Sequence, residues 1–196
     1  MTITIYGDRI SGNCLKVKWV AERLGQAYVW IDVDVVKGEA KAQEFLALHP
    51  AGQVPAVVLA DGRTLAQSNA IMLHLAEGSD LIPGDPYDRA VMFQWLFWEQ
   101  YSHEPVIAVR RFQKHYLGKP EHEIDPSLEV KGASVLTHMN AALAGRLWFA
   151  GDALSLADVA LVAYTRVAHE GGFDVSAYPA VAAWIARVEA TLPIRG

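Results

Sequence analysis

The chain has 196 residues, of which 52% are hydrophobic and 20% are charged. This composition is typical of a globular protein with a substantial core, and it excludes a disordered chain. The formal net charge is −5, so no chain-wide basic field attracts nucleic acid or anionic membrane, and we expect neither as a partner.

The cysteine content and the length of the apolar stretches bear on the compartment. Cys14 is the only cysteine, so no intrachain disulfide forms. Residues 1–6 carry no basic segment ahead of a long apolar run, as a secretory signal would. No stretch approaches the ~18 uninterrupted apolar residues of a membrane span. We therefore expect a cytoplasmic protein.

The first part of the chain predicts a strand, a helix and a second strand. Residues 2–6 alternate polar and apolar side chains, as a strand does. Residues 28–35 are rich in valine, isoleucine and aromatic side chains and predict another strand. Between them, after a loop over 8–13, apolar side chains recur at helical spacing up to a glycine stop; they are Val17, Val20, Ala21 and Leu24, followed by Gly25. A helix between two strands predicts a parallel pair.

Residues 40–77 extend this pattern to a complete domain. We expect two helices, two strands and a two-residue turn, at 40–48 (helix), 56–60 (strand), 61–62 (Asp-Gly turn), 63–66 (strand) and 68–77 (helix). The resulting order, β-α-β-α-β-β-α, predicts an α/β thioredoxin-like domain over residues 1–80.

The second part of the chain carries helix signals alone. Residues 81–86 form a linker with two prolines and a glycine, in which Asp85-Pro86 favours a helix start. Residues 155–158, Ser-Leu-Ala-Asp, resemble a capping box with aspartate in place of glutamate. We expect an all-α domain over residues 87–196, with helices at 87–117, 127–147, 155–169 and 179–191.

Ser11-Gly12-Asn13-Cys14 lies between the first strand and the first helix, where thioredoxins carry Cys-x-x-Cys. Ser11 forms no redox disulfide, but its hydroxyl can donate to the thiolate of a ligand, beside the positive end of a helix. Lowering a thiol pKa of about 8.5 by two units requires about 2.7 kcal/mol. One hydrogen bond to a charged group supplies about 1.5–3 kcal/mol. The alternative is that Ser11 merely caps the helix.

Two further motifs flank the last two strands of this domain. Gln53-Val54-Pro55 precedes a strand, and a cis proline there would turn the Val54 N–H and C=O outward to pair with an extended peptide. An ordinary trans proline is the alternative. Gln67-Ser68 opens a helix, with Ser68 as the N-cap residue. Its N–H groups and hydroxyl suit a carboxylate, and the Gln67 carbonyl suits an α-amino group.

The order of the three motifs resembles the signature of cytosolic glutathione transferases. Ser-x-x-Cys follows the first strand, Val-Pro precedes the third, and Gln-Ser follows the fourth. An all-helical second domain with a Ser-x-x-Asp capping box is also a trait of that family, and Ser11 is similar to the serine-type (theta-like) bacterial branch. The resemblance implies the glutathione transferase fold, glutathione as co-substrate without a cofactor, and a homodimer.

The resemblance also implies roles for individual residues. Ser11 would hydrogen-bond the glutathione sulfur. Val54, followed by a cis Pro55, would pair through its backbone with the cysteinyl unit. Gln67 and Ser68 would hold the γ-glutamyl end.

The glycyl end of glutathione is less well supplied. Gln53 would contact the peptide, at a position where relatives often have a basic residue. Theta-type relatives often place a histidine for the glycyl carboxylate where this chain has Ala40. Lys37 or Lys41 can compensate, or both can simply belong to a solvated face.

The second domain holds the candidates for the other substrate. In the family, the equivalent of its first helix lines both the dimer interface and the electrophile pocket. Tyr101, His103, Arg110 and Phe112 are therefore candidate contacts with a second substrate or a partner subunit, although aromatic side chains at helical spacing are most often core. The seven histidines show no cluster with ligand spacing, so we expect no metal. We expect Cys14 to be a small buried residue rather than a redox centre.

The leading hypothesis is a detoxification enzyme, a glutathione transferase that ionises glutathione and conjugates it to a small apolar electrophile by alkyl or aryl transfer. One alternative is glutathione-dependent reduction of disulfides or peroxides. The other is a non-catalytic binding or interaction protein that keeps the fold.

Overall fold

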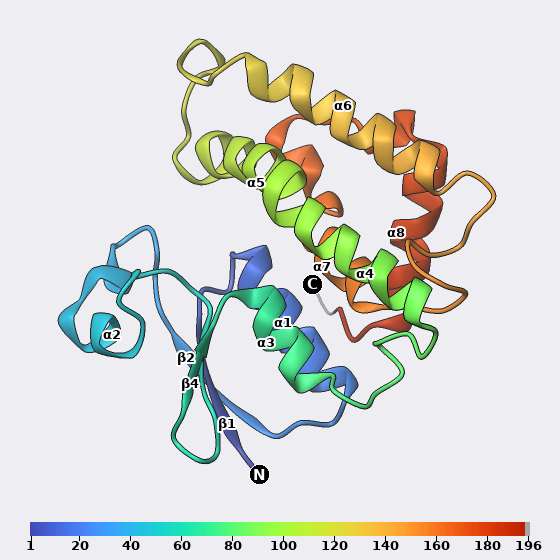
Figure 1. The fold of residues 1–196 in the computed structure, drawn as a ribbon. Coiled ribbons are helices and arrows are strands. Elements are labelled where there is room, and N and C mark those ends of the chain that lie inside the picture. Colours follow the sequence, from blue (N-terminus) through green and yellow to red (C-terminus); the bar gives the residue numbers. More distant parts are fainter. Residues whose placement is uncertain (195–196) are drawn as a thin grey trace. The chain divides into compact units, whose positions relative to one another are not determined.

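The computed structural model describes residues 1–194, which divide into two compact units. One unit comprises residues 1–79 together with residues 192–194, and the other comprises Asp80–Thr191. Figure 1 shows the sheet in the first unit, whereas the second consists of helices. No helix in the described part of the chain is long and apolar enough to cross a membrane.

The first unit is built on a four-stranded sheet in the order β2-β1-β3-β4. Its strands are β1 (Ile3–Gly7), β2 (Tyr28–Asp32), β3 (Ala56–Val58) and β4 (Thr64–Ala66). β1 runs parallel to β2 and antiparallel to β3, and β3 runs antiparallel to β4. The predicted parallel pair and the predicted order of elements are confirmed, although β2 ends three residues earlier than expected.

Two helices pack side by side in this unit, α1 (Gly12–Arg23) and α3 (Ser68–Leu75) (Figure 1). The apolar stripe of α1 explains the packing, since Val17, Val20 and Ala21 are fully buried. Gly25 has a φ of +65°, a conformation that favours glycine just beyond a helix end. The helix and its stop are therefore as predicted.

Two local expectations for this unit are wrong. The helix over 40–48 is broken at Ala42, whose extended backbone separates a 3₁₀ turn, η1 (Glu39–Lys41), from α2 (Gln43–Leu48). The hairpin loop is longer than two residues. The Gly62 N–H donates to the Leu59 C=O, and the Leu59 N–H donates to the Arg63 C=O, with Gly62 at a φ of +84°. A three-residue loop that ends in a left-handed glycine is another common hairpin form.

The helical unit opens with one long helical stretch. The Asp85 carboxylate caps it as predicted and accepts from the N–H groups of Tyr87 and Asp88. The stretch runs through α4 (Pro86–Trp98), a π-helical turn η2 (Glu99–His103), α5 (Glu104–Arg111) and a second π-helical turn η3 (Phe112–Tyr116).

The first π-helical turn ends at His103, two residues before Pro105. A proline has no N–H to donate to the carbonyl four residues back, and its ring crowds that carbonyl. A wider turn relieves this conflict without ending the helix. The sequence pattern predicts the extent of this stretch, but not its two π-helical turns.

The remaining elements of this unit are α6 (Ser127–Ala142), α7 (Leu156–Thr165) and α8 (Pro179–Thr191), with 3₁₀ turns η4 (Glu121–Glu123), η5 (Ala168–Gly171) and η6 (Val175–Ala177). Every residue of α7 is buried, so this helix is the core of the unit. α6 and α7 both end earlier than expected.

The predicted capping box at the start of α7 is part of a buried network. Asp158 accepts from the Ser155 N–H and hydroxyl, each at 3.0 Å. It also accepts from the Phe149 N–H at 3.1 Å and the Trp184 indole N–H at 2.9 Å. Burial raises the pKa of Asp158, and these four donors oppose that rise. The Asp158 carboxylate thus joins the start of α7 to Trp184 of α8 and to Phe149, which precedes α7.

Candidate functional site

Ser11 lies at the junction of β1 and α1. Its C=O accepts from the N–H groups of Cys14 and Leu15, at 3.0 and 2.9 Å, so it is the N-cap residue of α1 by backbone geometry. Its hydroxyl, however, makes no capping bond to the helix. The side chain of the half-buried Ser11 therefore does not cap α1. The alternative, that Ser11 merely caps the helix, does not describe its hydroxyl.

Cys14 is buried on the first turn of α1. Burial raises the pKa of its thiol to about 12, partly offset by a hydrogen bond from the Ser11 hydroxyl and by the Asp8 N–H. A thiol in this state is neutral at physiological pH and a poor nucleophile. The expectation that Cys14 is buried is confirmed.

The Val54–Pro55 peptide bond is cis, as the resemblance implies. The half-buried Val54 side chain packs against the buried cluster Val33, Ala40, Phe45 and Ala56. Neither its N–H nor its C=O takes part in a hydrogen bond within residues 1–194. This pair is therefore available to an extended ligand.

Gln67 adopts a φ of +68°, and among the described residues it is the one non-glycine residue with a positive φ. Such backbone conformations cost of order 1–3 kcal/mol and cluster at ligand-binding sites. Gln67, not Ser68, is the N-cap residue of α3, so the predicted cap is wrong by one position. Ser68 is the first helical residue, and its N–H is therefore one of the unpaired donors of the helix N-terminus.

The N-termini of α1 and α3 are joined by a side-chain hydrogen bond. The hydroxyl of the buried Ser68 donates to the Asn13 Oδ1 at 3.1 Å. This contact brings the Ser11 motif and the Gln67-Ser68 motif together, with Asn13 between them. Sequence reasoning passed over Asn13, whose partner lies 55 residues further along the chain.

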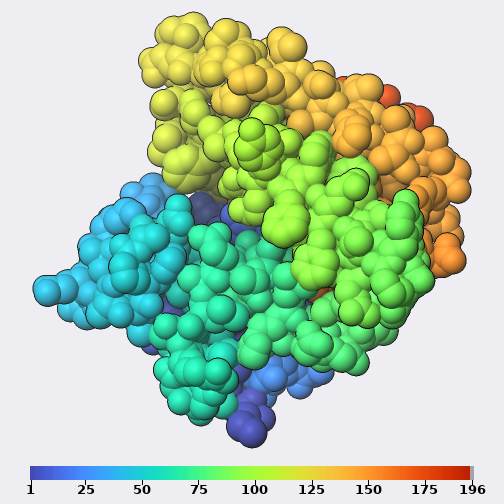
Figure 2. All heavy atoms as spheres, in the orientation of Figure 1, coloured from blue at the N-terminus to red at the C-terminus, as the bar shows by residue number. Residues whose placement is uncertain are grey.

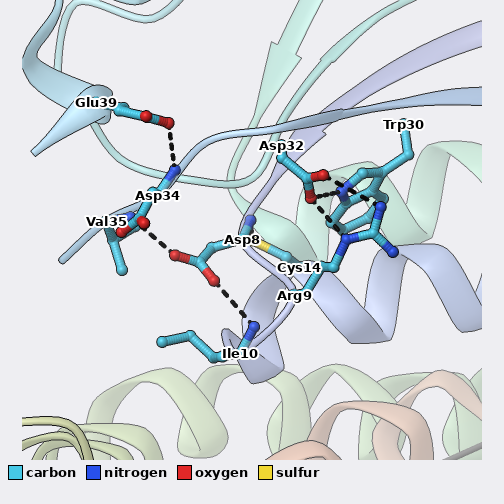
Figure 3. Close-up of polar contacts among 9 residues, drawn as sticks. All are labelled: Asp8, Arg9, Ile10, Cys14, Trp30, Asp32, Asp34, Val35 and Glu39. Atoms are coloured by element: carbon cyan, nitrogen blue, oxygen red, sulfur yellow. Dashed lines mark hydrogen bonds and ion pairs between the residues drawn. The ribbon is translucent and has the colours of Figure 1, made fainter. Parts of the chain in front are cut away.

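Asp8 is a second residue that sequence reasoning missed. Its buried carboxylate accepts from the Ile10 N–H at 2.9 Å and from the Val35 N–H at 2.8 Å (Figure 3). An aspartate that bonds the N–H two residues on is a common turn signal, so the first contact could have been found. The second joins residues 27 positions apart and leaves no local trace.

The candidates for the glycyl end have other contacts. Ala40 is buried in the cluster below Val54 and presents no polar group. Lys37 pairs with Asp34 at 2.8 Å on the surface. The ammonium of Lys41 donates to the carbonyls of Ala51 at 3.2 Å and Gly52 at 2.9 Å, so Lys41 holds the loop ahead of Gln53.

The four candidates in the helical unit differ in environment. Tyr101 is 87% exposed, and Phe112 is half-buried beside Tyr116. His103 is fully buried, 2.9 Å from the Thr165 hydroxyl. Arg110 is also buried and bonds the Gly171 carbonyl and Glu121. The structure thus gives His103 and Arg110 internal contacts, and a role for any of the four toward a second substrate stays a prediction.

No group of three or more histidine, cysteine, aspartate or glutamate side chains suited to a metal ion occurs among residues 1–194. The candidate site in the first unit therefore consists of hydroxyl, amide and main-chain groups at the ends of α1, β3 and α3. Such groups can hydrogen-bond a peptide-like ligand, and the hydroxyl of Ser11 can donate to a ligand's sulfur.

A thioredoxin-like sheet followed in the chain by an all-helical unit is the fold of the glutathione transferases. A family model described as Glutathione S-transferase, N-terminal domain, matches residues 1–77, and one described as Glutathione S-transferase, C-terminal domain, matches residues 96–191. The chain belongs to the glutathione S-transferase family.

Three known proteins illustrate the similarity. A glutathione S-transferase structure from Pseudomonas fluorescens is 44% identical, with a TM-score of 0.92 over 96% of this chain and 94% of that one. The structure of Ure2p in complex with glutathione is 26% identical, with a TM-score of 0.86 over 95% and 93% of the two chains. The disulfide-bond oxidoreductase YfcG of Escherichia coli is 29% identical, covering 90% of this chain and 85% of the relative.

Proposed function

We propose that this chain is a cytoplasmic glutathione transferase of the serine type, which stabilises the glutathione thiolate and conjugates it to an apolar electrophile. The main support for the proposal is that the N–H and C=O of Val54 have no hydrogen-bond partner within residues 1–194. Val54 belongs to the motif for which the family resemblance implies backbone pairing with glutathione. The bond between Asn13 and Ser68 supports it, because it brings the sulfur end and the γ-glutamyl end of the expected site together.

In this proposal Ser11 supplies the chemistry. Its hydroxyl makes no capping bond to α1, and it can donate its hydrogen to the sulfur of glutathione. The N–H groups and dipole of α1 add to the stabilisation of the thiolate. Binding both substrates then supplies proximity, with no covalent enzyme intermediate.

Replacing the hydroxyl of Ser11 tests the proposal. Ser11→Ala should lower turnover of a model aryl halide roughly 10–100-fold, because one hydrogen bond to a charged group contributes about 1.5–3 kcal/mol. Ser11→Thr, which keeps a hydroxyl, is the matched control and should retain more activity than Ser11→Ala. Unchanged turnover in Ser11→Ala would remove Ser11 from the chemistry.

A second candidate function is glutathione-dependent disulfide or peroxide reduction, which the similarity to YfcG favours. Assays of a model disulfide and a model aryl halide on the same preparation separate the two. We propose conjugation first, because the glutathione S-transferase from Pseudomonas fluorescens is more similar to this chain, at 44% identity, than YfcG is, at 29%. A disulfide turnover far above the aryl halide turnover would reverse this order.

We also propose a homodimer. Large hydrophobic side chains are exposed along the first helical stretch of the second unit, Phe97 at 72% and Tyr101 at 87%. Figure 2 shows α4 in green at the surface of that unit. Equilibrium sedimentation should give about twice the chain mass of 21.5 kDa. A mass of one chain at micromolar concentration would reject the dimer.

A further inference from the structure

Asp8 is a buried carboxylate in the short loop between β1 and α1, three residues before Ser11. The residue is 8% exposed, and its two oxygens accept from the main-chain N–H groups of Ile10 and Val35. Figure 3 shows this carboxylate between the two segments that it joins. Hydrogen bonds from N–H groups to a buried carboxylate are about twice as strong as neutral ones, and a carboxylate is costly to bury without them.

The main chain of Asp8 adds two contacts to the same loop. Its C=O accepts from the Ser11 N–H at 3.2 Å, and its N–H points to the Cys14 Sγ at 3.4 Å. With the Ile10 contact, these bonds set the path of the chain from the end of β1 to the first turn of α1. Asp8 therefore helps to fix the Ser11 backbone, together with the helix bonds that the Ser11 C=O accepts from Cys14 and Leu15.

The contact with Val35 ties this loop to the segment that follows β2. That segment has bonds of its own, since the Val33 N–H donates to the Gly7 C=O at 3.0 Å. The Asp34 N–H also donates to the Glu39 carboxylate at 2.8 Å. The Asp8 carboxylate thus anchors the Ser11 loop to a segment that other contacts already hold in place.

We propose that Asp8 is a positioning residue, which holds the Ser11 loop so that the Ser11 hydroxyl can reach the sulfur of a bound glutathione. The proposal rests on the proposed function. Asp8 does not touch the substrate in this scheme. Its role is to set the position of Ser11. Such positioning matters, because a misplacement of about 1 Å in a reacting group can cost on the order of 100-fold in rate.

The test compares the pKa of the bound glutathione thiol in Asp8→Asn with that in the unmodified protein. Asparagine keeps the size of the side chain but can accept at one oxygen, so one of the two N–H groups loses its partner. We expect the thiol pKa to rise by roughly half a unit to one unit and kcat/KM to fall about 10-fold. Asp61→Asn is the matched control, since Asp61 also accepts from the N–H two residues on, at 3.0 Å, in the exposed hairpin. It should change neither quantity.

The Ser11→Ala variant and the double variant separate the possible outcomes. If Asp8 acts through Ser11, adding Asp8→Asn to Ser11→Ala produces little further loss. If Ser11→Ala raises the thiol pKa but a folded Asp8→Asn does not, the positioning proposal is overturned. If Ser11→Ala itself leaves the thiol unchanged, the proposed function fails at Ser11, and the positioning proposal fails with it.

Asp8→Ser is the second variant, for the case in which Asp8→Asn does not fold. Its hydroxyl can keep the contact with the near Ile10 N–H but is too short for that of Val35. A folded Asp8→Ser should show a raised thiol pKa. A pKa equal to that of the unmodified protein would overturn the proposal.

Discussion

Cys14 illustrates how one buried side chain links local geometry to the behaviour of the protein with pH. Its thiol has a pKa of about 12 in the fold, against 9.0 when unperturbed. The folded state therefore holds this proton more tightly, and the stability that results is fully present below pH 9.0 and is lost as the pH rises toward 12. The loss is at most about 1.4 kcal/mol per pH unit.

Cys14→Ala should remove this part of the pH dependence. Urea unfolding between pH 8 and 11 should show a free energy of unfolding that falls less steeply in Cys14→Ala than in the unmodified protein. The slopes are compared, because the cavity left by the sulfur lowers the stability of the variant at every pH. Equal slopes would show that the Cys14 thiol titrates in the folded protein as it does in the unfolded chain.

At the scale of elements, Asp158 joins the start of α7 to α8. Asp158→Asn replaces one acceptor oxygen by an amide, so at least one buried donor loses its partner. We expect a loss of about 2–4 kcal/mol in the free energy of unfolding, since each unsatisfied buried donor costs about 1–3 kcal/mol. Denaturant titration measures this change.

The exposed Asp152→Asn is the matched control and should change stability by less than about 0.5 kcal/mol. A loss equally small in Asp158→Asn would mean that the network contributes little.

The packing of α6 against Phe173 depends on the absence of a side chain at Gly132. A Cβ at Gly132 would lie 2.2 Å from the ring of Phe173, which is buried. Gly132→Ala should destabilise the protein by about 1–3 kcal/mol through overpacking. Alanine also gains about 1 kcal/mol over glycine in a helix, so we expect a net loss of up to about 2 kcal/mol.

Thermal unfolding measures the stability of Gly132→Ala, and Gly84→Ala is the control. A Cβ at Gly84 meets nothing within 4 Å, so this variant should unfold at the temperature of the unmodified protein. If Gly132→Ala were as stable as the unmodified protein, the Phe173 ring would have to move aside at no cost.

Across the whole molecule, the sequence predicts what periodicity and local turn chemistry determine. The order of elements, the parallel pair of β1 and β2, the cap at Asp85 and the helical second unit follow from such patterns. The broken helix near Ala42 and the two π-helical turns do not, because they depend on how neighbouring segments pack. At the candidate site, the order of the motifs indicates the family resemblance, and that resemblance implies the cis Pro55 and the roles of Gln67 and Ser68.

The contacts that connect those motifs were not predictable from local sequence. Asn13 meets Ser68 across 55 residues, and Asp8 meets Val35 across 27. Neither pair shares a helical or strand period, so a single sequence offers no signal that the two partners touch. Candidate ligand-binding residues that belong to a motif are therefore easier to predict than residues that contact them from distant parts of the sequence.

The most direct test of the proposed function is the ionisation of glutathione on the protein. The ultraviolet absorbance of the thiolate, titrated against pH at saturating protein, gives the pKa of the bound thiol. We expect a value about two units below the ~8.5 of a free thiol, and a return toward ~8.5 in Ser11→Ala. A bound thiol that titrates like free glutathione, or no binding at millimolar glutathione, would contradict the proposal.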